Sequence, residues 1–209
     1  MLLFQRIFLI IGIVVLMTVS AGTQAHADWR RAETENFIIY SDTSEGELRQ
    51  FARKVQRFHG VLRTFYPVTL ETVPPKLEIF VVNGNSEMQK IAPGIGSGIG
   101  GFYSASDNRI YAVVDRRSGN GDNTLFHEYT HHFMLHYLPG PYPAWFIEGF
   151  AEYYATVDMN RSRSRVGLFN PGRMNSLTGQ FQWVPMEDLL ASRTSQLRGN
   201  QIHIFYAQA

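Results

Sequence analysis

The stretch His127-Glu128-Tyr129-Thr130-His131 lies in a segment that has the pattern of a buried helix. Apolar side chains occupy much of the helical circumference around it, and the first proline downstream is Pro139. Asp122 or Asn123 can cap the N-terminus of such a helix. We therefore predict a mostly buried helix of about four turns.

The same stretch matches the short motif H-E-x-x-H. Residues four positions apart share a face of a helix, so His127 and His131 can offer imidazole nitrogens to one metal ion. Glu128 lies beside the first of them, where its carboxylate can act as a general base toward water activated by the ion. The motif also arises by chance, and a buried helix with two hydrogen-bonded histidines would have the same sequence. A third ligand is therefore needed to support the metal hypothesis.

A candidate third ligand lies in the next predicted helix. Residues 139–143, Pro-Gly-Pro-Tyr-Pro, force the chain out of the first helix and into a turn. A largely apolar helix can begin near Ala144 and return alongside the first, which would bring Glu148 toward the histidines. A buried carboxylate is costly unless it is paired or bound to metal. Glu152, one turn further on, could accept the other ring N–H of a ligand histidine. The alternative is that both acids belong to a solvated stripe.

The remaining histidines carry weaker signals. His132 and His136 are also four positions apart, but they project from a different side of the helix. They could form a second metal pair, although we expect them to be surface or lightly packed residues. His59 and His203 are isolated in the sequence.

Taken together, the H-E-x-x-H stretch and residues 145–153, Trp-Phe-Ile-Glu-Gly-Phe-Ala-Glu-Tyr, resemble the gluzincin zinc metallopeptidases. This is the thermolysin-like class, also called the peptidase MA-like domain. The second segment is similar to the W-x-x-E-G-x-A-E-Y stretch of many members, in which the first glutamate is the third zinc ligand. The resemblance implies that His127, His131 and Glu148 bind Zn²⁺. It also implies that Glu128 is the catalytic base and that Glu152 supports a ligand histidine.

The sequence also departs from this family in two places. The G-A-M-E-N segment of the aminopeptidases has no counterpart, and Ile147 replaces the asparagine that commonly precedes the third ligand. The nearest resemblance is therefore to exported bacterial proteins with a peptidase MA-like domain. Peptidase activity follows only from the site, and the substrate stays open.

The N-terminal segment predicts export. Residues 1–27 contain one base, Arg6, then an apolar run, and end in Ala-His-Ala, which is typical of a signal peptide cleaved before Asp28. We expect a periplasmic or extracellular protein without a stable membrane span after cleavage; an uncleaved anchor is the alternative. Cleavage would leave 18 of the 19 basic residues against 18 acidic ones, and this neutral balance argues against a nucleic-acid partner.

Composition and periodicity predict the fold class. Ser44 and Glu47 form a capping box at the start of a long amphipathic helix that ends before Pro67. Short apolar strands flank this helix, so we predict an α+β fold: a small mixed sheet with an N-terminal long helix, followed by a helical zinc-binding half. We expect one peptidase MA-like domain over residues 28–209, divided into a strand/helix half (28–118) and a helical half (119–209). The chain has no cysteine, so zinc ligands must be His, Asp or Glu, which favours a catalytic site over a structural one.

A predicted hairpin precedes the metal helix. Residues 93–101 are rich in glycine, and strands follow at Phe102-Tyr103 and at residues 109–114. In the family that the chain resembles, an edge strand just before the metal helix aligns an extended substrate. The residues to which the resemblance assigns this pairing with peptide backbone are Arg109, Ile110, Tyr111, Ala112 and Val113. The alternative is an ordinary core hairpin.

Residues 201–209 form an apolar run with the pattern of an opening helix and no stop signal. We therefore expect the catalytic domain to be C-terminally incomplete. In gluzincins a Tyr or His from this later region steadies the transition state, and the resemblance offers Tyr206 or His203 for that role.

These observations predict a zinc-dependent metallopeptidase that hydrolyses peptide bonds in a peptide or protein substrate, with Glu128 as general base. The competing interpretation is an exported metal-binding or scaffold protein that has a peptidase-like domain and no turnover. A further alternative is an envelope hydrolase that acts on a non-protein amide.

Overall fold

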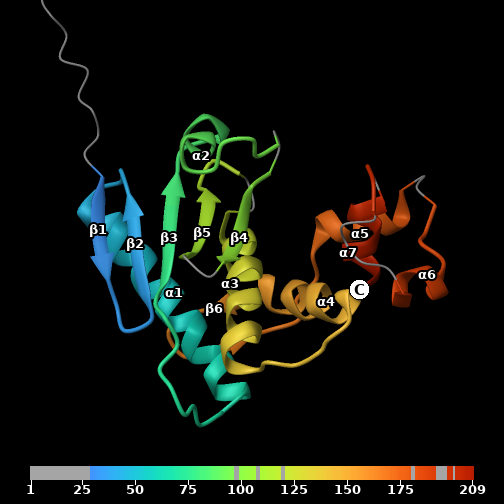
Figure 1. Ribbon diagram of the computed structural model, residues 1–209, viewed down its shortest axis with the longest axis horizontal. Coiled ribbons are helices and arrows are strands. Elements are labelled where there is room, and N and C mark those ends of the chain that lie inside the picture. The colour runs from blue at the N-terminus through green and yellow to red at the C-terminus, as the bar shows by residue number, and fades with distance from the viewer. Residues whose placement is uncertain are drawn as a thin grey trace, which may run out of the picture.

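The computed structural model describes residues 29–96, 99–106, 109–118, 121–179, 182–191, 197–199 and 201–209. The predicted signal peptide, residues 1–27, lies outside these described residues. Within them the chain is a mixed α+β structure with a small mixed sheet, which confirms the predicted fold class (Figure 1). No helix in the described ranges is long and apolar enough to cross a bilayer.

The five-stranded sheet has the order β1-β2-β3-β5-β4. Its strands are β1 (Arg30–Glu33), β2 (Phe37–Ser41), β3 (Leu77–Val82), β4 (Gly101–Ser106) and β5 (Arg109–Asp115). The three inner strands run parallel, and β1 and β4 pair antiparallel at the two edges. The inner strands carry nearly continuous apolar residues because helices cover both of their faces.

The long helix α1 (Glu45–Phe65) connects β2 to β3. The predicted capping box is confirmed: the Ser44 hydroxyl accepts from the Glu47 backbone N–H, and the Glu47 carboxylate accepts from the Ser44 N–H. The helix ends at Phe65, two residues before Pro67, as proline requires. Its apolar stripe, which includes Val55 and Phe58, packs against the sheet.

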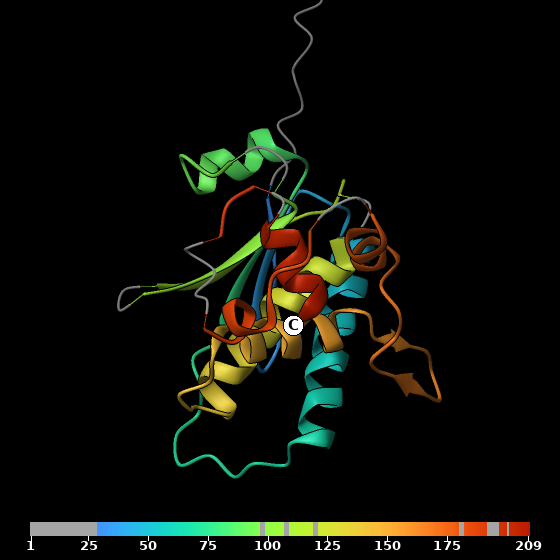
Figure 2. The same ribbon diagram turned by 90° about the vertical axis from the view of Figure 1, so that its right-hand side faces the viewer.

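Helix α3 (Gly121–Tyr137) carries the H-E-x-x-H stretch and lies on the same face of the sheet as α1 (Figure 2). The shorter α2 (Asn85–Ile91) covers the opposite face, where Met88 packs on Val82 and Val113. The predicted cap at Asp122 or Asn123 is wrong, because both residues lie inside the first turn of α3. The Asp122 carboxylate instead pairs with Lys54 of α1 at 2.7 Å.

The chain then turns through residues 139–143 into α4 (Ala144–Ala155), as the prolines predict. A two-stranded ribbon follows, β6 (Asp158–Met159) and β7 (Ser164–Arg165). Three further helices are α5 (Pro171–Thr178), α6 (Met186–Ala191) and α7 (Gln201–Gln208). They lie beyond α4, on the side of the molecule away from β1 (Figure 1).

The edge strand in front of the metal helix is β4, not β5. The prediction that residues Arg109, Ile110, Tyr111, Ala112 and Val113 form an open edge is therefore wrong. Ala112 pairs with Ile79 of β3 on one side and with Tyr103 of β4 on the other, so β5 has no free edge. The physical reason is burial: Ala112, Val113 and Val114 are almost fully buried, and an apolar run of this kind belongs inside a sheet.

Candidate metal centre

Three side chains converge between α3 and α4. The Nε2 atoms of His127 and His131 lie 3.0 Å apart. The Glu148 Oε2 atom lies 3.2 Å from the first of these nitrogens and 3.4 Å from the second. Among the described residues these three form the group of side chains that could hold a metal ion, and each contributes one atom within 4.8 Å of the others.

This geometry fits a tetrahedral zinc ion. Zinc binds imidazole nitrogen at about 2.0–2.1 Å, so two ligand atoms of one tetrahedral ion lie roughly 3.3 Å apart. The three observed separations of 3.0, 3.2 and 3.4 Å scatter around that value. Two imidazoles and one carboxylate also form a set that leaves one position of the ion open.

Glu148 reaches the histidines because of the turn between the helices. The prolines of residues 139–143 end α3 and turn the chain so that α4 packs against it. Aromatic packing then holds α4 in place: Phe150 and Tyr154 contact Tyr66, and the Tyr154 hydroxyl donates to the Tyr66 hydroxyl at 3.1 Å. The site is thus carried by two packed helices rather than by loops.

The two histidines keep the Glu148 carboxylate ionised. Burial raises the pKa of Glu148, but hydrogen bonds with His127 and His131 outweigh burial and lower this pKa to about 2. Burial likewise lowers the pKa of His127, yet hydrogen bonds with Glu148 and Glu152 raise it to about 9. A negative carboxylate therefore faces the two rings, as binding of a cation requires.

Glu152 lies where the sequence predicted. Its Oε1 atom is 3.2 Å from the His127 Nδ1 atom, the ring nitrogen that points away from Glu148. A carboxylate in this position fixes the tautomer and the orientation of a ligand histidine. Burial raises the pKa of Glu152, but hydrogen bonds with His127 and Arg173 lower it to about 2.

Arg173 of α5 is a residue of this site that the sequence did not indicate. Its Nε atom donates to Glu152 Oε2 at 2.9 Å, and its Nη2 atom donates to Oε1, so the pair is bidentate. The guanidinium also lies 5.0 Å from the centre of the Tyr206 ring. Arg173 follows Glu152 by 21 positions, in a segment rich in Gly, Asn and Pro, where no local pattern marks it.

Glu128 projects toward β4, next to the metal-ligand group. Burial raises its pKa, while the neighbouring charges of His127 and His131 and a hydrogen bond from the Tyr103 backbone lower it, and burial dominates. A carboxylate whose pKa is raised by burial is better matched to proton transfer near neutral pH than an exposed one.

Both candidate residues of the last helix line the same cleft as the metal ligands. This cleft has a volume of about 650 Å³ and is bounded by β4, α3, α4, α5 and α7. The Tyr206 ring stands edge-on to the His127 ring with centroids 5.9 Å apart, and burial raises the pKa of its hydroxyl, which stays protonated. His203 lies on the exposed rim, one turn before Tyr206.

The expectation for His132 is wrong. This residue is only 2% exposed, because β4 covers the part of α3 that bears it, and burial lowers its pKa to about 3. Its Nδ1 atom lies 3.3 Å from the Tyr103 hydroxyl. His59, which carried no signal in the sequence, is also buried, and its Nδ1 atom lies 2.6 Å from the Tyr129 hydroxyl.

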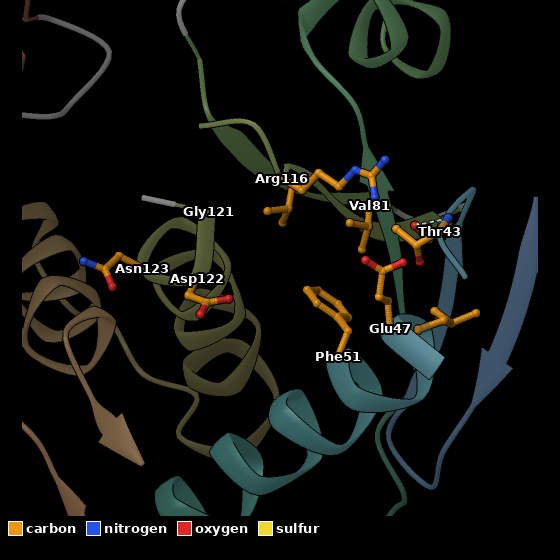
Figure 3. Close-up of a pocket in the computed structure, with 11 residues that line it drawn as sticks. Thr43, Glu47, Phe51, Val81, Arg116, Gly121, Asp122 and Asn123 are labelled. Carbon is orange, nitrogen blue, oxygen red and sulfur yellow. Dashed lines mark hydrogen bonds between the residues drawn. The ribbon is translucent and has the colours of Figure 1, made fainter. Parts of the chain in front are cut away.

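A second hollow, of about 580 Å³, lies at the carboxyl ends of β2, β3 and β5 (Figure 3). It is separate from the metal centre, since none of the three ligand candidates lines it. Its charged side chains already have partners: Arg116 lies 3.5 Å from Asp42, and Asp122 pairs with Lys54. The hollow thus lacks a convergent group of histidines and carboxylates like that of the first cleft.

Comparison with known proteins adds no relative to this geometry: no family model matches the chain, and no curated protein matches it.

Proposed function

We propose that this chain is a zinc-dependent metallopeptidase of the gluzincin type, built on a thermolysin-like peptidase MA-like domain. The observation that carries the proposal is the convergence of His127, His131 and Glu148 at separations that suit one zinc ion. Two further facts support it: the motif glutamate stands beside this group, and an open cleft adjoins it.

Each residue of the cleft has a role in the proposed reaction. Zinc, when bound by the three ligands, supplies a Lewis acid that polarises a carbonyl and lowers the pKa of water. Glu128 takes the proton of the attacking water and returns it to the leaving amine. The Tyr206 hydroxyl donates to the oxygen on which negative charge develops, and Arg173 orients both Tyr206 and Glu152.

The proposed substrate-aligning strand is β4. The Asp115 N–H donates to the Gly100 carbonyl at 2.8 Å, so residues 100 and 115 form a hydrogen-bonded pair. Because an antiparallel strand alternates the direction of its backbone groups, Gly101, Tyr103 and Ala105 direct theirs to the open edge. Gly101 and Tyr103 line the cleft, and an extended peptide can pair there as an added strand. With the predicted signal peptide, the proposed substrates are periplasmic or extracellular peptides or proteins.

The test is a measurement of metal content followed by a hydrolysis assay. The full chain is purified, its zinc content is determined, and it is incubated with a broad peptide library with and without a chelator. Cleavage that the chelator abolishes and added zinc restores would support the proposal. Stoichiometric zinc without cleavage would instead support the exported metal-binding or scaffold protein.

A further inference from the structure

Three residues on one side of α3 face β4. Thr124, Glu128 and His132 are spaced by four residues, so they lie on one side of the helix, next to the side that bears His127 and His131. Each of the three meets β4. The metal-binding stripe and the strand-binding stripe are thus neighbours on one rigid helix.

The contacts follow the strand in order. Gly101 lies so close to α3 that a Cβ atom there would be 2.7 Å from Thr124 Cγ2. Two residues further on, the Tyr103 backbone lies close enough to the Glu128 carboxylate to lower its pKa, against the larger effect of burial. The Tyr103 side chain then reaches past Glu128 to His132, with 3.3 Å between the hydroxyl and Nδ1 and the rings edge-on at 5.7 Å.

Tyr103 therefore meets two of these three residues, Glu128 and His132. Its backbone contacts the proposed base, and its side chain is held by a histidine that is only 2% exposed. An edge strand pairs on one side only, and β4 pairs only with β5 within the sheet. The position of β4 relative to Glu128 therefore depends on its contacts with α3.

We propose that His132 is a positioning residue that, through the Tyr103 hydroxyl, fastens the open edge of β4 to the metal-binding helix. The fastened strand keeps its backbone beside Glu128 and presents its free edge at a fixed distance from the three ligands. The effect of His132 on turnover rests on the proposed function. Its effect on the position of β4 does not.

The experiment compares four full-length variants with the wild type. Tyr103→Phe removes the hydroxyl and keeps the ring and the backbone N–H. His132→Phe removes the nitrogen that faces the Tyr103 hydroxyl and keeps a ring. His132→Asn places an amide oxygen near the position of Nδ1 and should rescue the contact. Tyr111→Phe is the matched control, because it makes the same chemical change on the neighbouring strand, where no hydrogen bond of the hydroxyl is observed among the described residues.

Hydrogen exchange of the β4 amides is the readout that needs no activity. Loss of one partly buried hydrogen bond should speed exchange of the β4 amides that face β5, those of Phe102, Ser104 and Ser106, by about tenfold in Tyr103→Phe and His132→Phe. Bound zinc, exchange in β3 and the behaviour of His132→Asn and Tyr111→Phe should match the wild type. Unchanged β4 exchange in Tyr103→Phe, or equal acceleration in Tyr111→Phe, would overturn the proposal, and Tyr103→Phe decides the matter even if His132→Phe fails to fold.

Kinetics separate this proposal from the proposed function. If the wild type cleaves a peptide, Tyr103→Phe and His132→Phe should lose about tenfold in kcat/KM with full zinc occupancy, and His132→Asn should recover it. Wild-type turnover in both variants would remove the positioning role. If the wild type cleaves nothing, the proposed function fails, while accelerated β4 exchange still supports the fastening by His132.

Discussion

The Nε2 atoms of His127 and His131 lie 3.0 Å apart and face the same carboxylate oxygen of Glu148. Two ring nitrogens at this distance direct their lone pairs at one point, which is an unfavourable arrangement unless a proton or a metal ion occupies it. The carboxylate is held ionised by the same histidines. The cluster therefore has the charge and the geometry of a cation site, and each of its members can be tested separately.

Replacing Glu128 by Gln should separate catalysis from metal binding. The amide keeps the shape of the side chain but cannot accept a proton, so we expect zinc stoichiometry to be unchanged and peptide hydrolysis to fall by about 10²–10⁴-fold. Metal analysis and the hydrolysis assay on the same sample measure both. Glu71→Gln, in an exposed loop, is the control and should leave both unchanged. Loss of zinc from Glu128→Gln would assign the residue a structural role instead.

Glu148 and Glu152 should differ in their effect on zinc affinity. Glu148→Ala removes a ligand, so most of the bound zinc should be lost on competition with a chelator. Glu152→Ala removes no proposed ligand but takes away the carboxylate that pairs with His127 Nδ1 and with Arg173, and the affinity should fall by about 10–100-fold. Unchanged zinc stoichiometry in Glu148→Ala would refute its assignment as a ligand. A larger loss of zinc affinity in Glu152→Ala than in Glu148→Ala would instead assign the ligand role to Glu152.

Zinc affinity should rise with pH up to about 9. In the metal-free protein burial lowers the pKa of His127, but hydrogen bonds with Glu148 and Glu152 raise it to about 9. Below that value the ring carries a proton that must leave before Nε2 can bind an ion, and above it no proton competes. We expect the apparent affinity to rise by about tenfold per pH unit up to this point and then level off.

Calorimetry in buffers of different ionisation enthalpy measures the proton released on zinc binding. Glu152→Gln keeps an oxygen beside His127 Nδ1 but removes the negative charge that helps to raise the pKa of His127, so the plateau should begin at a lower pH in this variant. A zinc affinity that is flat between pH 7 and 9 would contradict the expectation.

The local parts of the site could be predicted from the sequence, and the parts that depend on distant packing could not. His127 and His131 follow from helical periodicity alone, and Glu148 follows because a stiff, proline-rich turn leaves α4 little choice of direction. Arg173 could not be predicted, because its partner Glu152 lies 21 positions away across an irregular segment.

The two wrong predictions, for His132 and for β5, have a common cause. The helix pattern does not reveal that β4 covers His132, so it predicts an exposed residue there. Strand order is not encoded locally, so the sequence alone does not show that β5 lies inside the sheet. The apolar run Ala112-Val113-Val114 was the signal that could have corrected this, since strands buried on both faces have that pattern.

Two glycines with opposite surroundings test the fit between β4 and α3. A Cβ atom on Gly101 would lie 2.7 Å from both the Val113 carbonyl oxygen and Thr124 Cγ2, and the backbone atom cannot move away. Gly101→Ala should therefore destabilise the fold by about 1–3 kcal/mol. Gly60 lies in the interior of α1 with nothing within 4 Å, so Gly60→Ala should stabilise by about 0.5–1 kcal/mol through helix propensity. Urea unfolding measures both, and equal stability of Gly101→Ala and wild type would show that β4 does not pack this closely on α3.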